Sequence, residues 1–119
     1  FISSYFGERQ DPFTGHQAFH KGVDFAGTMG ADVIAVAAGI VTYVGEKSGF
    51  GHIVEVSHGN GFVTRYAHNS AAAVKVGDTV QRGQTLALMG STGRSTGPHV
   101  HFEVLRNGRP VNPLSFIGQ

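Results

Sequence analysis

The sequence predicts an all-β fold with very little helix, and three observations support that prediction. Eighteen glycines in 119 residues fall between short apolar stretches along the whole chain, as is typical of strands joined by tight turns. Two short segments carry the residues that hairpin turns require. No run of ten or more residues shows a helical repeat of apolar positions free of glycine. Together these features describe a compact, glycine-rich β domain.

The strands can be placed in order along the chain. Asn60-Gly61 predicts a hairpin turn, because both positions suit a positive φ. The run R-N-G-R-P at 106–110 predicts a second turn. Residues 70–76 (S-A-A-A-V-K-V) are the only candidate for a turn of helix. The stretches with the composition of strands broken by turns are residues 32–45, 52–68, 78–90 and 99–111.

Composition excludes several classes of protein. With 40% apolar and 14% charged residues the chain is globular, and a formal net charge of +1 gives no support to nucleic-acid binding. The absence of cysteine excludes disulfides and thiolate metal sites, so a transition metal would need His, Asp or Glu. No apolar run approaches the ~18 residues of a transmembrane helix. We expect a single, monomeric domain over residues 1–119. Because the chain opens on Phe1, we also expect it to be a fragment of a longer chain.

The segment H-V-H-F-E-V, from His99 to Val104, places two histidines on one face of a strand. His99 and His101 would lie about 6.6 Å apart along it, close enough to serve one site. A solvated strand face with incidental histidines explains the pair equally well. Glu103 shares that face and could support a metal ligand, although a surface carboxylate is the commoner case.

A second cluster, H-x-x-x-D, contains His20 and Asp24. On a continuous strand the two would lie about 13 Å apart, too far to bind one ion at ~2.0–2.2 Å. If both are ligands, the chain must bend near Lys21-Gly22. In isolation, a turn aspartate and an exposed histidine are the more economical explanation.

A third element, T-R-Y-A-H-N-S, ends a predicted strand with His68, which shares one face with Thr64 and Tyr66. These three alternate with Val63, Arg65 and Ala67. A lone histidine at a strand end is usually a surface residue. The three clusters together, however, contain three metal ligands and two further imidazoles. That is the composition of an open catalytic zinc site with acid–base partners.

The order H-x-x-x-D, Y-A-H and G-S-T-G-x-S-T-G-P-H-V-H-F-E resembles the lysostaphin-type (LytM-like) zinc metallopeptidases, which cut peptide cross-links in bacterial peptidoglycan. The resemblance extends over nearly the whole chain. It implies a small antiparallel β-sheet or sandwich whose groove is flanked by loops. It further implies one Zn²⁺ bound by His20, Asp24 and His101, with His68 and His99 as the unligated catalytic pair. His99 is the first choice for the general base, but the sequence leaves the two roles interchangeable.

The resemblance also implies a substrate and a location. Residues 6–24 look like those of enzymes from Gram-negative envelopes, so we expect a D,D-endopeptidase that cuts direct links between D-alanine and a diamino acid, in the periplasm or cell envelope. A glycyl-glycine endopeptidase and a non-catalytic module that binds the wall or activates amidases remain alternatives. Residues 74–90 also resemble biotinyl and lipoyl carrier domains, but residues 91–97 lack the lysine that such a domain would modify.

Overall fold

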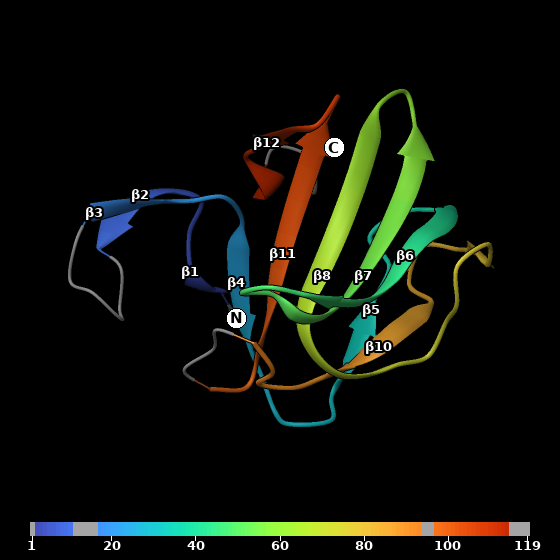
Figure 1. Ribbon diagram of the computed structural model, residues 1–119, viewed down its shortest axis with the longest axis horizontal. Coiled ribbons are helices and arrows are strands. Elements are labelled where there is room, and N and C mark those ends of the chain that lie inside the picture. The colour runs from blue at the N-terminus through green and yellow to red at the C-terminus, as the bar shows by residue number, and fades with distance from the viewer. Residues whose placement is uncertain (1, 11–16, 94–96, 115–119) are drawn as a thin grey trace.

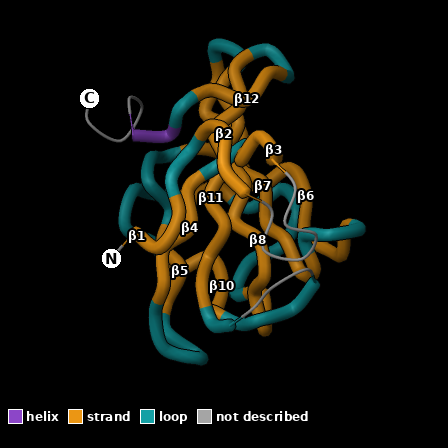
Figure 2. Tube along the Cα trace, turned by 90° about the vertical axis from the view of Figure 1, so that its left-hand side faces the viewer, coloured by secondary structure: helices purple, strands orange, loops and turns teal. Residues whose placement is uncertain are grey.

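Most of the strands hydrogen-bond into one antiparallel sheet, and this sheet positions every candidate residue except His20, which ends a strand of a second, smaller sheet (Figure 1). The computed structural model describes residues 2–10, 17–93 and 97–114. The trace of these residues consists very largely of strands and loops (Figure 2). The strands are β1 (Ile2–Ser4), β2 (Gly7–Gln10), β3 (Gln17–His20), β4 (Val23–Ala26), β5 (Asp32–Ile34), β6 (Gly39–Lys47), β7 (Gly51–Gly59), β8 (Phe62–Ala72), β9 (Thr79–Val80), β10 (Thr85–Met89), β11 (His99–Arg106) and β12 (Arg109–Val111).

The main sheet has the order β1-β4-β11-β8-β7-β6-β9. β10 pairs with both β8 and β5, and β12 pairs with β11. β2 and β3 form a separate two-stranded sheet that extends to one side of β4 (Figure 1). The predicted all-β, antiparallel fold is therefore confirmed. No helix in the described part of the chain is long and apolar enough to cross a membrane.

Both predicted hairpin turns are present. β7 and β8 are joined through Asn60 (φ 52°) and Gly61 (φ 80°), and β11 and β12 through Asn107 (φ 52°) and Gly108 (φ 82°). Two successive residues at positive φ match the right-handed twist of the flanking strands, and Asn-Gly tolerates this conformation best. The first hairpin brings β8 beside β7 at the centre of the sheet.

The expected turn of helix at residues 70–76 is wrong. β8 instead continues to Ala72, because Ala71 and Ala72 pair with Leu88 and Ala87 of β10. Alanine has the highest intrinsic helix propensity, but propensity is a weak determinant and pairing with a neighbouring strand overrides it here.

The two faces of the sheet differ sharply. Tyr66, Phe102 and Val104 lie on one face and belong to the buried apolar core, where the Tyr66 and Phe102 rings are 5.3 Å apart. Residues opposite one another in antiparallel strands share a face. Opposite pairs on the other side are polar: Asp24 faces His101, and Arg65 faces Glu103. We call this second side the polar face.

The chain bends where the sequence required it to bend. β3 ends at His20 and β4 begins at Val23, so Lys21-Gly22 separates the two strands. Gly22 is buried against β11, and a Cβ there would collide with the Phe102 carbonyl oxygen and the Glu103 side chain. Glycine therefore lets the bend lie directly against the strand that carries His101.

Candidate metal centre and active site

The centre of the polar face is a buried pair of side chains from β4 and β11. Asp24 and His101 lie opposite one another, and His101 Nδ1 is 2.7 Å from Asp24 Oδ1. Their relative exposures are only 8% and 9%. The antiparallel pairing of β4 with β11 thus brings together two residues that are 77 positions apart in the sequence.

The second nitrogen of the same ring is held by Glu103. His101 Nε2 lies 2.8 Å from Glu103 Oε2. Glu103 is 1% exposed, so the more common expectation of a surface carboxylate is wrong. When Nε2–H donates to Glu103, Nδ1 of the neutral ring carries the lone pair and points toward Asp24. A carboxylate behind a histidine orients metal ligands in this way.

The two carboxylates also determine the charge of the ring. Burial lowers the pKa of His101, but the hydrogen bonds to Asp24 and Glu103 outweigh it and raise the pKa to about 9. Burial raises the pKa of Glu103, but the hydrogen bond and charge of His101, together with Arg65, outweigh burial. The pKa of Glu103 therefore lies below its ordinary value. Between its two carboxylates His101 is an imidazolium at neutral pH. The space between the Asp24 and Glu103 carboxylates therefore favours a positively charged group.

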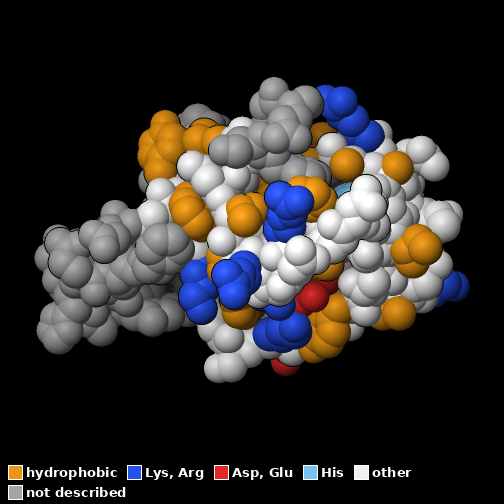
Figure 3. Space-filling view, turned by 90° about the horizontal axis from the view of Figure 1, so that it is seen from above, with side chains coloured by type: hydrophobic (Ala, Val, Ile, Leu, Met, Phe, Trp, Pro, Cys, Tyr) orange, Lys and Arg blue, Asp and Glu red, His pale blue; other side chains and the backbone are white. Residues whose placement is uncertain are grey.

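A row of alternating charges continues across the polar face from Glu103. Arg65 Nη1 lies 3.3 Å from Glu103 Oε1, and Arg65 Nε lies 3.2 Å from Glu55 Oε2. Lys47 Nζ is 2.8 Å from the same Glu55 oxygen. Basic and acidic side chains are seen close together on one surface of the molecule (Figure 3). Each carboxylate of the row is paired with a cation, which offsets the cost of its burial.

His68 reaches the polar face through a β-bulge. Val54 pairs with Tyr66 and His52 with Asn69, so Ile53 faces two residues of β8 instead of one. His68 has a φ of 66°. A regular alternation would have placed it on the face of Tyr66, in the core, so the predicted common face of Tyr66 and His68 is wrong. The extra residue reverses the direction of the side chain.

The bulge gathers three imidazoles. The His68 ring centroid lies 4.8 Å from that of His99 and 6.0 Å from that of His101. His99 Nε2 is in turn 3.8 Å from Asp24 Oδ1. Asp24, His68, His99 and His101 thus form one cluster, and four of the five residues singled out in the sequence lie together.

Two of these rings are anchored to backbone carbonyls. His68 Nδ1 lies 2.6 Å from the Thr92 oxygen and His99 Nδ1 lies 2.8 Å from the Gly97 oxygen. A carbonyl can only accept, so each Nδ1 carries the proton and Nε2 carries the lone pair of the neutral ring. Burial is the main cause that lowers the pKa of His68. His68 is therefore neutral at neutral pH and can accept a proton.

His20, the fifth residue, ends β3 beside the bend at Gly22. Its side chain lies outside what the structure describes. Among the described side chains, no group of three or more His, Asp or Glu residues is arranged to hold a metal ion. The pair Asp24–His101, with Glu103 behind it, nevertheless fits zinc chemically, since one oxygen and one nitrogen donor face each other and the imidazole has a carboxylate partner.

Comparison with known proteins decides the family. Residues 18–113 match peptidase family M23. The chain belongs to that family. The matched region runs from β3 to just beyond β12 and so contains every residue of the candidate site.

Relatives and structural neighbours of this chain are described as peptidases, and one of them as a zinc-containing peptidase. The DD-carboxypeptidase/endopeptidase Mpg of Neisseria meningitidis serogroup B is 46% identical over 114 residues, which are 96% of this chain and 26% of that protein. A zinc-containing peptidase from Vibrio cholerae has a similar structure, with a TM-score of 0.86 and 43% identity over 94% of this chain and 35% of the other. The catalytic domain of lysostaphin from Staphylococcus simulans is also similar, with a TM-score of 0.90 and 31% identity. The match covers 100% of this chain and 92% of the lysostaphin domain.

The chain spans about a quarter of the length of the curated relatives that it matches. The predicted resemblance to lysostaphin-type peptidases is confirmed by the family and by these structures.

Residues of this M23 domain that sequence reasoning missed come from strands and loops far along the chain. Phe50 lies between His101 and Arg65, 6.0 Å from the ring centroid of the first and 6.0 Å from the guanidinium carbon of the second. Glu55 and Thr92 complete the surroundings. Only Thr92, within the glycine-rich run before His99, stood in a segment that the sequence had marked.

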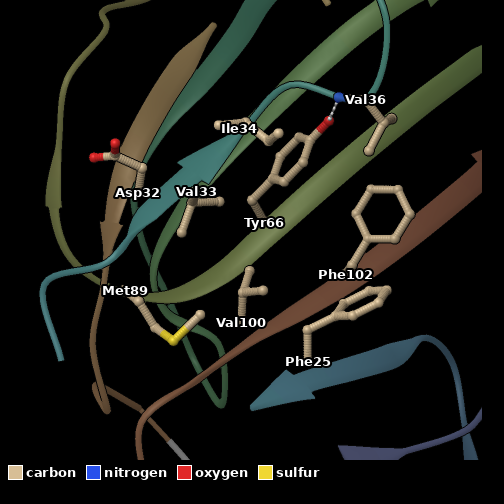
Figure 4. A pocket seen from close by; sticks show the side chains of 9 residues that line it. All are labelled: Phe25, Asp32, Val33, Ile34, Val36, Tyr66, Met89, Val100 and Phe102. Carbon is tan, nitrogen blue, oxygen red and sulfur yellow. Dashed lines mark hydrogen bonds between the residues drawn. The ribbon is translucent and has the colours of Figure 1, made fainter. Parts of the chain in front are cut away.

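A cavity of about 340 Å³ lies on the apolar face (Figure 4). Phe25, Tyr66 and Phe102 line it, and the Val36 backbone N–H donates to the Tyr66 hydroxyl at 3.2 Å. Among the described residues that line it, Asp32 is the only acidic or basic one, and it is exposed. The titratable side chains described above gather instead on the polar face.

Proposed function

We propose that this domain is a zinc-dependent endopeptidase that hydrolyses peptide cross-links of bacterial peptidoglycan. The observation that supports this most strongly is the Asp24–His101 pair, with Glu103 behind it and two carbonyl-anchored imidazoles beside it. An imidazole–carboxylate ligand pair next to unligated bases is the arrangement of an open catalytic zinc site.

The proposed ligands of a single Zn²⁺ are His20, Asp24 and His101. Zn²⁺ bound there would supply a Lewis acid for the scissile carbonyl and the attacking water. Glu103 would hold His101 so that Nδ1 faces the ion, and Arg65 would keep Glu103 ionised. The bend at Gly22 is short enough for β3 and β4 to contribute to one site.

The two remaining imidazoles take the proton-transfer roles. His68 is neutral with its lone pair on Nε2, so it is placed to accept the proton of the attacking water and to return it to the leaving amine. His99, 3.8 Å from Asp24 at the other side of the cluster, would in its doubly protonated form donate from Nε2 to the carbonyl oxygen as negative charge develops there, while Nδ1–H stays on the Gly97 carbonyl. This reverses the first choice made from the sequence, because only the structure gives the burial of His68.

The proposed bond is the direct link between D-alanine and a diamino acid, and the proposed location is the periplasm or cell envelope. The name of the Neisseria relative, a DD-carboxypeptidase/endopeptidase, supports this specificity, and the likeness to lysostaphin is to a protein of the same fold with lower identity. The domain is proposed to act as a monomer.

Digestion of purified sacculi tests the proposal. The domain, loaded with zinc, should convert cross-linked dimers of directly linked sacculi into monomers, with the fragments separated and identified by mass. Release of glycine peptides from pentaglycine-bridged walls, with direct links untouched, would overturn the specificity. No cleavage of either wall by the zinc-loaded full-length protein would overturn the enzymatic proposal.

The zinc affinity of the site is expected to rise with pH up to about 9. Burial lowers the pKa of His101, but its carboxylate partners raise it to about 9 in the absence of metal, against about 6.5 in an unfolded chain. Zinc needs the neutral ring, so binding must displace this proton. The apparent association constant should therefore increase ~10-fold per pH unit between about pH 6.5 and 9. The metal-free fold should lose stability as the pH rises through the same window, because the raised pKa stabilises it only while His101 is protonated.

Competition with a chelator of known affinity measures the first effect, and thermal unfolding of the metal-free protein measures the second. A zinc affinity that is flat across this window, after correction for the chelator, would remove His101 from the ligand set.

A further inference from the structure

We propose that Thr92 is a positioning residue that fixes the orientation and the tautomer of His68. The inference rests on the proposed function, in which His68 accepts a proton. Thr92 lies in the loop before β11, 24 positions from His68 in the sequence, yet each of its polar groups described below is used on or beside the bulge that carries His68.

The Thr92 hydroxyl joins the two strands at the bulge. Its Oγ1 accepts a hydrogen bond from the His52 backbone N–H at 3.1 Å and donates one to the Asn69 carbonyl oxygen at 2.7 Å. His52 and Asn69 are the pair that faces across β7 and β8 immediately beyond the extra residue. The hydroxyl thus bridges a backbone donor of β7 and a backbone acceptor of β8 beside the bulge, where the ladder is irregular.

The Thr92 carbonyl acts on the side chain of His68 itself. It lies 2.6 Å from Nδ1, while the backbone N–H of His68 donates to the Phe50 carbonyl oxygen at 2.8 Å. The ring of His68 is therefore held by the Thr92 carbonyl, and its backbone is held by the Phe50 carbonyl from a different loop. A non-glycine residue at positive φ has a higher conformational energy than one in an extended strand. The two hydrogen bonds offset that energy at His68.

The two loops fit against each other without space for a side chain. A Cβ on Gly51 (φ 65°) would lie 2.5 Å from Thr92 Oγ1, and a Cβ on Gly93 (φ 73°) would collide with the backbone of Gly51. Asn69 is 1% exposed and its Nδ2 donates to the Tyr66 carbonyl oxygen at 2.8 Å, across the bulge. Thr92 is therefore packed closely against Gly51, and no other described side chain is seen to take the place of its hydroxyl between His52 and Asn69.

Thr92→Val is the informative substitution, because it keeps shape and carbonyl but removes the hydroxyl. We expect kcat on cross-linked peptide to fall ~10- to 100-fold, the usual effect of removing a group that orients an active-site histidine, with little change in KM. Thr92→Ser should restore most of kcat, since it returns the hydroxyl. Thr79→Val, on the exposed residue of the edge strand β9, is the matched control and should change neither constant.

Two further readouts separate positioning from a general loss of stability. In a His68→Ala background Thr92→Val should cause no additional loss of kcat. Nitrogen-15 NMR of the imidazoles, recorded without substrate, should show His68 as the Nδ1–H tautomer in the wild type and a mixture of tautomers in Thr92→Val. This spectrum tests Thr92 even if the domain cleaves no cross-link. A Thr92→Val protein with wild-type kcat or an unchanged His68 spectrum would overturn the proposal, as would additive losses in the double variant.

Discussion

His101→Ala is expected to lose most of the zinc that the wild-type domain carries, and with it the endopeptidase activity. Elemental analysis after dialysis should give about one equivalent per chain for the wild type and a small fraction of that for the variant. The physical reason is twofold. The substitution removes a nitrogen donor, and it leaves Asp24 and Glu103 buried at 8% and 1% exposure without the ring that separates them.

The matched control is His58→Gln. His58 lies on β7 of the same sheet. Like His101 it forms hydrogen bonds through both ring nitrogens, to Ala38 O and Thr64 Oγ1 at 2.7 Å each. Its neighbour Ser57 pairs with Val63, and Val63 pairs with Leu105, four residues beyond His101 or about 13 Å along β11, so the zinc content of the His58→Gln variant should equal that of the wild type. Removal of one partner from a buried ionic pair costs ~3–5 kcal/mol. Circular dichroism must therefore show that His101→Ala is folded, and Asp24→Asn provides a second test. Full zinc retention in folded His101→Ala would contradict the proposed ligand set.

His68→Ala and His99→Ala are expected to keep their zinc and still lose at least ~10²-fold in kcat each, the scale of acid–base and oxyanion groups. Both rings are held by backbone carbonyls and are placed beside the Asp24–His101 pair without being proposed as ligands. Zinc content and kcat, measured on the same preparations, separate ligation from proton transfer. Turnover near that of the wild type in either variant would refute the role of that residue, and loss of zinc in either would make it a ligand.

The sequence predicts a site best where the strand that carries it is regular. His99, His101 and Glu103 lie on the same side of β11 because nothing interrupts its alternation. The Asn-Gly turns were predictable for a similar local reason, as both residues of each turn adopt positive φ. The family resemblance then joined clusters that periodicity alone could not bring together.

The remaining features depend on contacts between distant segments. His68 faces the site only because β8 contains an extra residue opposite Ile53, and no local signal in Y-A-H-N-S indicates a bulge. Glu103 is buried because Arg65 and Phe50, from other parts of the chain, lie around it and His101. The side chain of His20 lies outside the described residues, so its role stays a prediction.

Because the β2–β3 sheet is separate from the main sheet, the proposed ion would also link the two sheets mechanically. With His20 on β3 and His101 on β11 as ligands, the ion would close a loop of about 80 residues between two sheets that are not hydrogen-bonded to each other as ladders. A cross-link that spans a loop of this length restricts the unfolded chain, and the lost entropy raises the free energy of the unfolded state by about 4.5 kcal/mol at room temperature, by the relation used for disulfides. Zinc would then be a staple as well as a Lewis acid. A cysteine-free domain would have, in a reversible metal bond, the kind of tether that small secreted domains obtain from disulfides.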